Sequence, residues 1–251
     1  MLLRDFKRLI SISTLHRILI ASGLSLKKCS QVMKIANLEL VQAFCLSWNE
    51  RFGIVRQDQL VFLDEISFRS DDFHRPRGRS PKGEAVATLK VQFSEKQVSC
   101  AVSIDCKGII LSHIKEGHYD RSAFVQFLSD LIDSGHLFRY PGPRSILILD
   151  GCKIHFSPDV YEAMRKAGLM YVKLPPYCPE MNPIEAFFAV LRRRVRLVWE
   201  HNQQVNPVEI LNSQLSHLQD YDCSRLFDHS GFCDYKYYSS PYMSEDLPRI
   251  C

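Results

Sequence analysis

Two short apolar runs in the chain each end on an acidic side chain. Residues 60–63 are followed by Asp64, and residues 146–149 are followed by Asp150. Short runs of this kind predict buried strands, where an ionised carboxylate is costly unless something compensates its charge. A single case is explained by a turn that carries the acid into solvent. Two strands with the same design favour a shared acidic site, provided that the strands lie side by side.

The rest of the chain alternates between strand-like and helix-like periodicity. The pattern predicts strands at 60–65, 85–93, 97–105, 108–114, 145–150 and 170–174. It predicts helices at 13–20, 31–52 and 120–134, after Ser157-Pro158, and at about 183–200. This succession is typical of an α/β, ribonuclease H-like fold, in which a mixed sheet is flanked by helices. In that fold the strands at 60–65 and 145–150 are neighbours, which would place Asp64 beside Asp150.

The helix patterns also predict caps and buried faces. We expect Ser13 or Thr14 to cap the first helix and Gly23 to end it. The positions expected to face the core are Ile35, Leu38, Val41 and Leu46 in the second helix, and Phe124, Phe127, Leu128 and Leu131 in the third. Residues 201–251 are weakly patterned and rich in aromatic side chains, and they predict no element.

A third acid stands at the start of the long helix, in the sequence Asn182-Pro183-Ile184-Glu185. Asn182 can cap this helix, and Asn-x-x-Glu resembles a capping box, which would by itself account for Glu185. The alternative is that Glu185 points to the ends of the strands and joins Asp64 and Asp150. A cluster of three carboxylates would suit magnesium or manganese. Both interpretations stay open at this point.

Composition narrows the class of protein. The chain of 251 residues is 46% apolar and 24% charged, which is ordinary for a globular protein. No stretch approaches the about 18 unbroken apolar residues of a membrane span, and charges at the start of the chain argue against a secretory signal. Nine cysteines lie at irregular spacing without a C-x-x-C pair. They indicate reduced thiols in an intracellular protein, and they lack the ligand spacing of a zinc site.

Positive charge is concentrated at the front of the chain. Residues 1–34 contain seven Lys or Arg and one Asp, a formal charge of +6, whereas the whole chain carries +4. A basic segment on a mildly acidic remainder indicates an arm or small module that meets phosphate. A solvated helical face would give the same composition.

Three segments resemble the catalytic blocks of the Tc/mariner superfamily of DDE transposases. They read "VFLDE", "LILDGCKIH" and "LPPYCPEMNPIEAFFAVLRRRV", and "RPRGRSPKGE" is similar to the family's Arg/Gly-rich loop. Between Asp150 and Glu185 lie 34 residues, a spacing typical of the family's Asp-Asp-Glu members. The resemblance extends over roughly residues 13–200. It departs from the family at Gly151, where many relatives have Asn, and at Cys178, where Ser or Thr is common.

The resemblance implies that Asp64, Asp150 and Glu185 bind two divalent ions, Mg²⁺ or Mn²⁺. These ions would support DNA strand cleavage and transfer by in-line displacement at a phosphodiester. His155 matches a histidine that is common in the second block, and it would either neighbour the metal site or the substrate, or pack in the core. Asn182 is expected to cap its helix and could shape the site, and Glu65 is expected to be an orienting or bystander acid.

Basic side chains are expected to contact DNA phosphates, which would make the affinity fall with salt. The candidates are Arg75, Arg77, Arg79 and Lys82 in the loop, Arg192, Arg193 and Arg196 in the long helix, and His16, Arg17, Lys27 and Lys28 near the N-terminus. Arg194 completes the arginine run, but four arginines so spaced on a helix cannot all face one way, so we expect one or two to reach DNA. The alternative for this run is a solvated helix face.

The segment "STLHRILIASGLSLKK" resembles the recognition helix of the family's last helix-turn-helix. Relatives usually carry two such modules, so we expect a shortened front: a partial module with a linker helix at 1–57, a catalytic domain at 58–200, and a tail of unknown role at 201–251. The implied partners are double-stranded DNA (transposon ends and target) and a second copy of the chain, without a membrane. The implied location is intracellular, in the nucleus if the source is eukaryotic. A silent or domesticated DNA-binding remnant, and a host nuclease of the same fold, are the alternatives.

Overall fold

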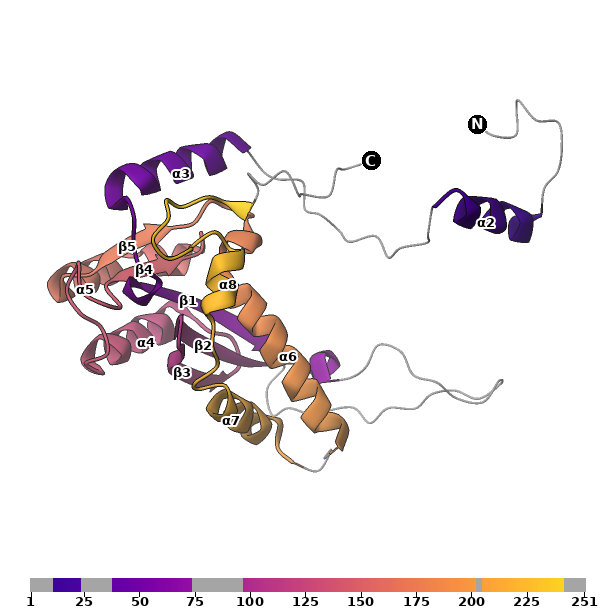
Figure 1. The fold of residues 1–251 in the computed structure, drawn as a ribbon. Helices are drawn as coiled ribbons and strands as arrows, with labels where there is room; N and C mark the ends of the chain where they lie inside the picture. The colour runs from indigo at the N-terminus through magenta and orange to yellow at the C-terminus, as the bar shows by residue number, and fades with distance from the viewer. Residues whose placement is uncertain (1–10, 24–37, 74–96, 202–204, 242–251) are drawn as a thin grey trace. The chain divides into compact units, whose positions relative to one another are not determined.

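The computed structural model describes residues 11–23, 38–73, 97–201 and 205–241 (Figure 1). The chain forms two compact units, residues 1–34 and 35–251. The described elements of the second unit are α3 (Leu38–Phe52), η1 (Gln57–Gln59), β1 (Leu60–Phe68), η2 (Ser70–Phe73), β2 (Val98–Asp105), β3 (Gly108–Glu116), α4 (Arg121–Asp133), β4 (Ile146–Leu149), η3 (Lys153–Phe156), α5 (Pro158–Ala167), β5 (Met170–Lys173), η4 (Pro179–Met181), α6 (Pro183–His201), α7 (Pro207–His217) and α8 (Ser224–His229). The strand predicted at 85–93 lies outside the described residues. Where the structure describes helices, none is long and apolar enough to cross a membrane.

The first unit contains α2 (Ile12–Ala21). Its N-cap is Ser11, whose Oγ accepts a hydrogen bond of 3.1 Å from the backbone N–H of Thr14. The predicted cap at Ser13 or Thr14 is therefore wrong, because the helix begins at Ile12, before both of these residues. The chain leaves the helix as expected, with Gly23 at φ +76°, a left-handed conformation that glycine adopts without strain. No residue of α2 is buried.

The sheet has the strand order β3-β2-β1-β4-β5. β1 and β2 are antiparallel, as are β2 and β3, whereas β4 is parallel to both β1 and β5. β1 and β4 are direct neighbours, with Leu63 opposite Leu149. This is the mixed sheet of the predicted ribonuclease H-like fold.

Strand β1 does not stop after its first acid. Its pairing with β4 ends at Leu63, but its pairing with β2 continues to Phe68. The predicted end at residue 65 was too early, because Ile66 and Phe68 continue the alternation of buried side chains against β2. Asp64 therefore lies within a strand, at the point where that strand loses one of its two neighbours.

Two apolar cores cover the two faces of the sheet. Side chains such as Phe62 belong to one core with α6, α7 and α8, and side chains such as Leu63 belong to the other with α4 and α5. Figure 1 shows α6 and α8 on one side of the sheet and α4 on the other. Because successive side chains of a strand point to opposite faces, Asp64 faces the α6 core and Glu65 faces the α4 core.

Helix predictions were accurate where the helix packs on the sheet and weaker elsewhere. The four positions predicted for the third helix are all buried in α4. In α3, however, the predicted Leu38 and Leu46 are 46% and 65% exposed, and the buried residues are Val41 and Trp48. Trp48 packs against Phe232 at 5.3 Å between ring centroids, a partner 184 positions away that the local pattern does not reveal.

The C-terminal region is structured, although its sequence predicted no element. In residues 205–241, α7 and α8 join the core, and the rings of Phe227 and Phe232 lie 4.9 and 5.1 Å from that of Phe62. The Gln57 side-chain amide donates to Asp228 and to the carbonyl of Phe232, both at 2.8 Å. The described part of this region therefore packs into the core of the second unit.

Candidate active site

The parallel pairing of β1 with β4 brings two acids to one edge. Leu63 and Leu149 are the last paired positions, so the next residue of each strand, Asp64 and Asp150, follows at the same level of the sheet. α6 begins at Pro183, and its first turn carries Glu185. The three predicted acids thus come from three separate elements.

Asp64 is almost fully enclosed, with 8% of its surface exposed. Its Oδ1 accepts a hydrogen bond of 2.8 Å from the Glu65 backbone N–H, and its Oδ2 accepts one of 3.1 Å from the Asn182 side-chain amide. Burial raises the pKa of Asp64 well above its usual range, and the nearby charges of Asp150, Glu65 and Glu185 raise it further. The carboxylate therefore sits in an excess of negative charge that a cation would relieve.

Asn182 does not cap α6, and the capping-box interpretation is wrong. The Asn182 backbone N–H donates to the carbonyl of Pro179 at 2.9 Å, so it does not need the Glu185 carboxylate. The Asn182 side chain turns toward the sheet instead, where Nδ2 binds Asp64. Its buried Oδ1 has no hydrogen-bond partner within the described ranges. The short 3₁₀ turn η4 sets this orientation, which a cap motif in the sequence cannot indicate.

Glu185 is exposed in the first turn of α6. Partial loss of solvent raises the pKa of Glu185, the charge of Asp150 raises it further, and Arg192 opposes the change. The three acids therefore influence one another electrostatically. Among the residues that the structure describes, however, no three His, Cys, Asp or Glu side chains are grouped closely enough to hold a metal ion as they stand.

His155 is completely buried between two acids. Its Nδ1 lies 2.7 Å from Oδ1 of Asp150, in an ion pair that lacks the alignment of a hydrogen bond. Its Nε2 lies 3.0 Å from both carboxylate oxygens of Glu65. The ring also packs on Phe124, at 4.4 Å between centroids. The ring is packed in the core, and it also touches Asp150, so the interpretation of His155 as a neighbour of a metal site stays a prediction that depends on Asp150.

The charge state of His155 follows from these contacts. Burial lowers the pKa of the imidazole, but its contacts with Asp150 and Glu65 outweigh burial and raise the pKa to about 10. Burial likewise raises the pKa of Asp150, yet the contact with His155 and the Cys152 backbone N–H, 2.9 Å from Oδ1, lower it overall. At neutral pH the pair is an imidazolium and a carboxylate. Glu65, expected to be an orienting or bystander acid, is in contact with this pair.

The predicted DNA-binding residues fall into four groups. Arg192 and Arg196 make contacts within the protein: Arg192 donates to the Asp72 carboxylate at 2.8 Å, and Arg196 donates to the Asp72 carbonyl at 3.3 Å. Arg193 and its neighbour Arg194 are exposed on α6. His16 and Arg17 are exposed on α2, and the remaining candidates (Arg75, Arg77, Arg79, Lys82, Lys27 and Lys28) lie outside the described residues.

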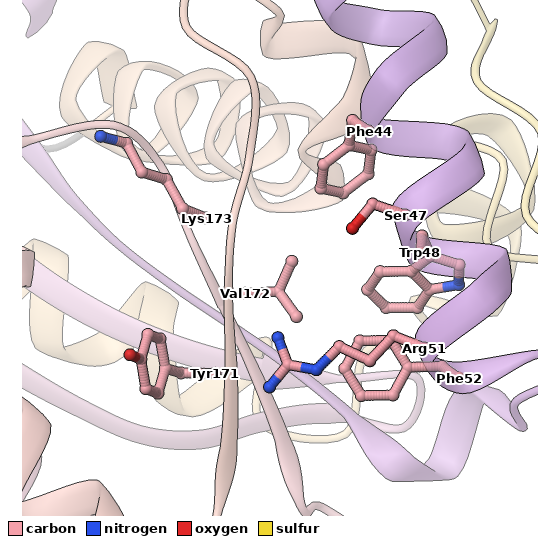
Figure 2. Close-up of a pocket in the computed structure, with 8 residues that line it drawn as sticks. All are labelled: Phe44, Ser47, Trp48, Arg51, Phe52, Tyr171, Val172 and Lys173. Carbon is pink, nitrogen blue, oxygen red and sulfur yellow. The ribbon is translucent and has the colours of Figure 1, made fainter.

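A separate cavity of about 210 Å³ lies between α3 and the edge strand β5. Figure 2 shows the Arg51 guanidinium reaching from the helix toward that strand, beside the rings of Trp48 and Phe52. The lining residues are Phe44, Ser47, Trp48, Arg51, Phe52, Tyr171, Val172 and Lys173. They include no acid, so this cavity is not the site built around Asp64.

Comparison with solved structures supports the fold. The chain is 18% identical to the protein in "Crystal structure of the mariner Mos1 paired end complex with Mg", with a TM-score of 0.63 over 95% of this chain and 78% of that one. It is 16% identical to "Mos1 transposase paired-end complex with left transposon end", with a TM-score of 0.58 over 94% and 77%. For "Crystal structure of the Mos1 mariner paired end complex with Mn" the identity is 16% and the TM-score 0.56, over 92% and 72%.

Comparison with protein families identifies the chain. No curated protein sequence matches it. The family described as "DDE superfamily endonuclease" matches residues 59–206, which span β1, β4 and most of the second unit and contain all three acids. Because this match covers more than half of the sequence, the chain belongs to the DDE superfamily of endonucleases.

Proposed function

We propose that this protein cleaves and transfers DNA strands as a transposase of the Tc/mariner type, and that Asp64, Asp150 and Glu185 bind the divalent ions it needs. The observation that carries the proposal is the parallel pairing of β1 with β4, which ends at Leu63 and Leu149 and so brings Asp64 and Asp150 to one edge of the sheet. In agreement with this, burial and the charges of Asp150 and Glu185 raise the pKa of Asp64, and burial and the charge of Asp150 raise the pKa of Glu185. All three acids lie in the region that matches the endonuclease family.

The donor atoms suit a hard divalent cation. Carboxylate oxygens are the ligands that Mg²⁺ and Mn²⁺ prefer, and a cation would relieve the mutual repulsion of the acids. Asp150 is held by His155 and the Cys152 backbone N–H, so the exposed Glu185 on the first turn of α6 is the acid that would turn toward the other two. Two of the similar structures are named as complexes with Mg and with Mn, which supports a divalent ion here.

Two bound ions would activate a water or a DNA 3′-hydroxyl and stabilise the leaving oxygen of an in-line displacement. The chain itself then needs no nucleophilic side chain. Asn182 holds one oxygen of Asp64, and His155 meets one oxygen of Asp150. Glu185 brings the third carboxylate from the first turn of α6. Exposed basic groups such as Arg193 would bind the phosphates of the substrate.

The partners follow from the same proposal. One of the similar structures is named as a transposase paired-end complex with the left transposon end, which supports double-stranded DNA as the ligand of this chain. A synapsis of two ends would use two copies of the protein. The protein would act wherever its DNA is located, which is the nucleus if the source is eukaryotic.

The test is a strand-cleavage assay on labelled duplex DNA with Mg²⁺ or Mn²⁺. The specific substrate would be the inverted repeats that flank the reading frame, and an unrelated duplex would serve for comparison. We expect cleavage of the repeats by the wild type and by Asp133→Asn, a matched change on the exposed end of α4. We expect none from Asp150→Asn, because losing one ligand disrupts the ion site.

Other outcomes identify the alternatives. DNA binding without cleavage under all metals would indicate a silent, DNA-binding remnant. Equal cleavage of both duplexes would indicate a nuclease of the same fold without end specificity. Cleavage that survives Asp150→Asn would contradict the proposed role of the acids.

A further inference from the structure

Glu65 and His155 form a buried ionic contact on the face of the sheet opposite Asp64. Both oxygens of Glu65 lie 3.0 Å from Nε2 of His155, and the ring packs on Phe124 of α4. The side chain of Glu65 is 13% exposed and that of His155 is fully buried. The pair belongs to the α4 core, whereas Asp64 and Asn182 meet on the α6 side.

Packing alone does not account for this arrangement. A buried ionic contact gives little net stability compared with apolar side chains of similar volume. The imidazole has an acid at each nitrogen, and the acid at Nδ1 is Asp150, at 2.7 Å. The ring therefore connects the second face of the sheet to the predicted metal site on its edge.

We propose that Glu65 is a positioning residue for the DNA-processing reaction: through His155, it holds the Asp150 carboxylate where the ions bind. This inference rests on the proposed function and adds a residue to it.

The positions of the three residues support this role. Asp150 follows the last paired residue of β4, so no strand ladder fixes its backbone beyond Leu149. Glu65, in contrast, lies within β1, paired to Ala101 of β2. The sheet fixes the backbone of Glu65, the Glu65 carboxylate would fix the His155 ring, and the ring would in turn fix the Asp150 carboxylate after β4. Asn182 contacts Asp64 in a similar way from the other face. Residues that orient metal ligands through hydrogen bonds affect metal binding without touching the ion.

The experiment compares Glu65→Gln with Glu209→Gln in the full chain. Both variants replace one Glu by Gln, and Glu209 is exposed in the first turn of α7. The affinity for Mn²⁺ is measured without DNA, from the electron paramagnetic resonance of the unbound ion, and cleavage is measured in parallel. We expect Glu65→Gln to raise the Kd for Mn²⁺ about 10-fold or more, and Glu209→Gln to leave it unchanged.

The readouts separate this inference from the function on which it rests. If Asp150→Asn loses Mn²⁺ binding while Glu65→Gln stays within about twofold of the wild type, the positioning role is wrong and the metal site stands. If Asp150→Asn binds Mn²⁺ and cleaves as the wild type does, the proposed function and the positioning role both fail. A purely structural Glu65 would lower Tm without changing the Kd of the folded protein.

A second variant covers the case in which Glu65→Gln does not fold. Glu65→Asp keeps the charge beside His155 but shortens the reach by one methylene. We expect Glu65→Asp to fold and to bind Mn²⁺ several-fold more weakly than the wild type. An unchanged Kd in this variant would overturn the proposal.

Discussion

Adjacent acids on one strand have different surroundings at this site. Asp64 is enclosed, its carboxylate accepts two hydrogen bonds, and the nearest charges are negative. Glu65 points to the other face and contacts an imidazolium. The alternation of a strand is sufficient to create this difference. Asp64 is therefore an acid whose ionised form opposes folding, and His155 is a base whose charged form favours it.

Asp64→Asn should stabilise the protein without metal at neutral pH. Because the folded pKa of Asp64 is raised, the wild type loses stability as the pH rises above the ordinary pKa of an aspartate, and Asn has no proton to lose. A gain of ~1 kcal/mol would raise Tm by about 2–4 °C in a chain of this size. The gain should shrink as the pH falls through the raised pKa, because the wild type then takes up the proton.

Thermal melts with EDTA and with millimolar Mg²⁺ test this expectation. Mg²⁺ should raise the Tm of the wild type and not that of Asp64→Asn, since a ligand stabilises only the protein that binds it. A variant that melts below the wild type at pH 7 with EDTA would contradict the expected sign.

His155→Gln should destabilise the protein in a pH-dependent way. The folded pKa of about 10 lies above the ordinary 6.5, so the charge of His155 contributes its full stability below pH 6.5. That contribution is lost as the pH rises toward 10, by up to ~1.4 kcal/mol per pH unit. The difference in unfolding free energy between wild type and variant should therefore narrow between pH 6.5 and 9.5. Urea titrations across this range measure it, and a constant difference would show that His155 is not charged.

Helix α6 carries one of the candidate metal-binding acids and a run of basic side chains. Glu185 stands in its first turn, and the arginines follow two to three turns later. At 100° per residue, neighbouring arginines leave the helix in different directions. Arg192 turns back to Asp72 and also lies over the Phe68 ring at 5.5 Å, whereas Arg193 is exposed. Arg192 therefore makes contacts within the protein, whereas the neighbouring Arg193 is accessible to DNA.

Arg193→Ala should change DNA binding but not stability, whereas Arg192→Ala should change stability. Arg193→Ala should weaken DNA binding, reduce the slope of log K against log salt by about 1, and leave stability unchanged. Arg192→Ala should lower the free energy of unfolding by about 0.5–1 kcal/mol, because it breaks a partly exposed pair with Asp72. Binding isotherms at several salt concentrations and urea titrations distinguish the two. A loss of DNA affinity confined to Arg192→Ala would reverse these assignments.

At the scale of the whole molecule, the C-terminal region completes the core of the second unit. The rings of Phe227 and Phe232 pack against Phe62 of the central strand β1, and Phe232 also contacts Trp48 of α3. Segments from both ends of this unit therefore share one core with β1. For this reason residues 35–57 belong to the same compact unit as the sheet. The site depends on this core, because β1 carries Asp64.

Phe227→Ala should cost about 3–5 kcal/mol of stability, as expected for removing a fully buried aromatic ring. Tyr235→Ala, at a side chain that is 75% exposed, should stay within about 0.5 kcal/mol of the wild type. Denaturant unfolding measures both changes. A neutral Phe227→Ala would mean that α8 does not belong to the folding unit.

Much of the fold and the identity of the three acids could be predicted from the sequence. The alternation in β1, the run in β4 and the helical period of α4 are local patterns of burial, and each follows from the residues of its own segment. The acids at 64 and 150 stood out because a charge interrupts an apolar run. The metal-binding role of these acids is still a prediction.

Only the tertiary structure shows which partners these side chains contact. Asn182 contacts Asp64 across 118 positions of sequence, and Arg192 contacts Asp72 across 120. The core of α3 and the packing of the C-terminal region depend on partners still farther away along the chain, at 184 and 175 positions. The periodicity of apolar residues predicts which side chains are buried, but it does not predict which side chain of another element each one contacts. Sequence by itself therefore determined the candidate acids and most of the elements between residues 60 and 200, whereas packing between distant segments determined the C-terminal helices and the contacts of these acids.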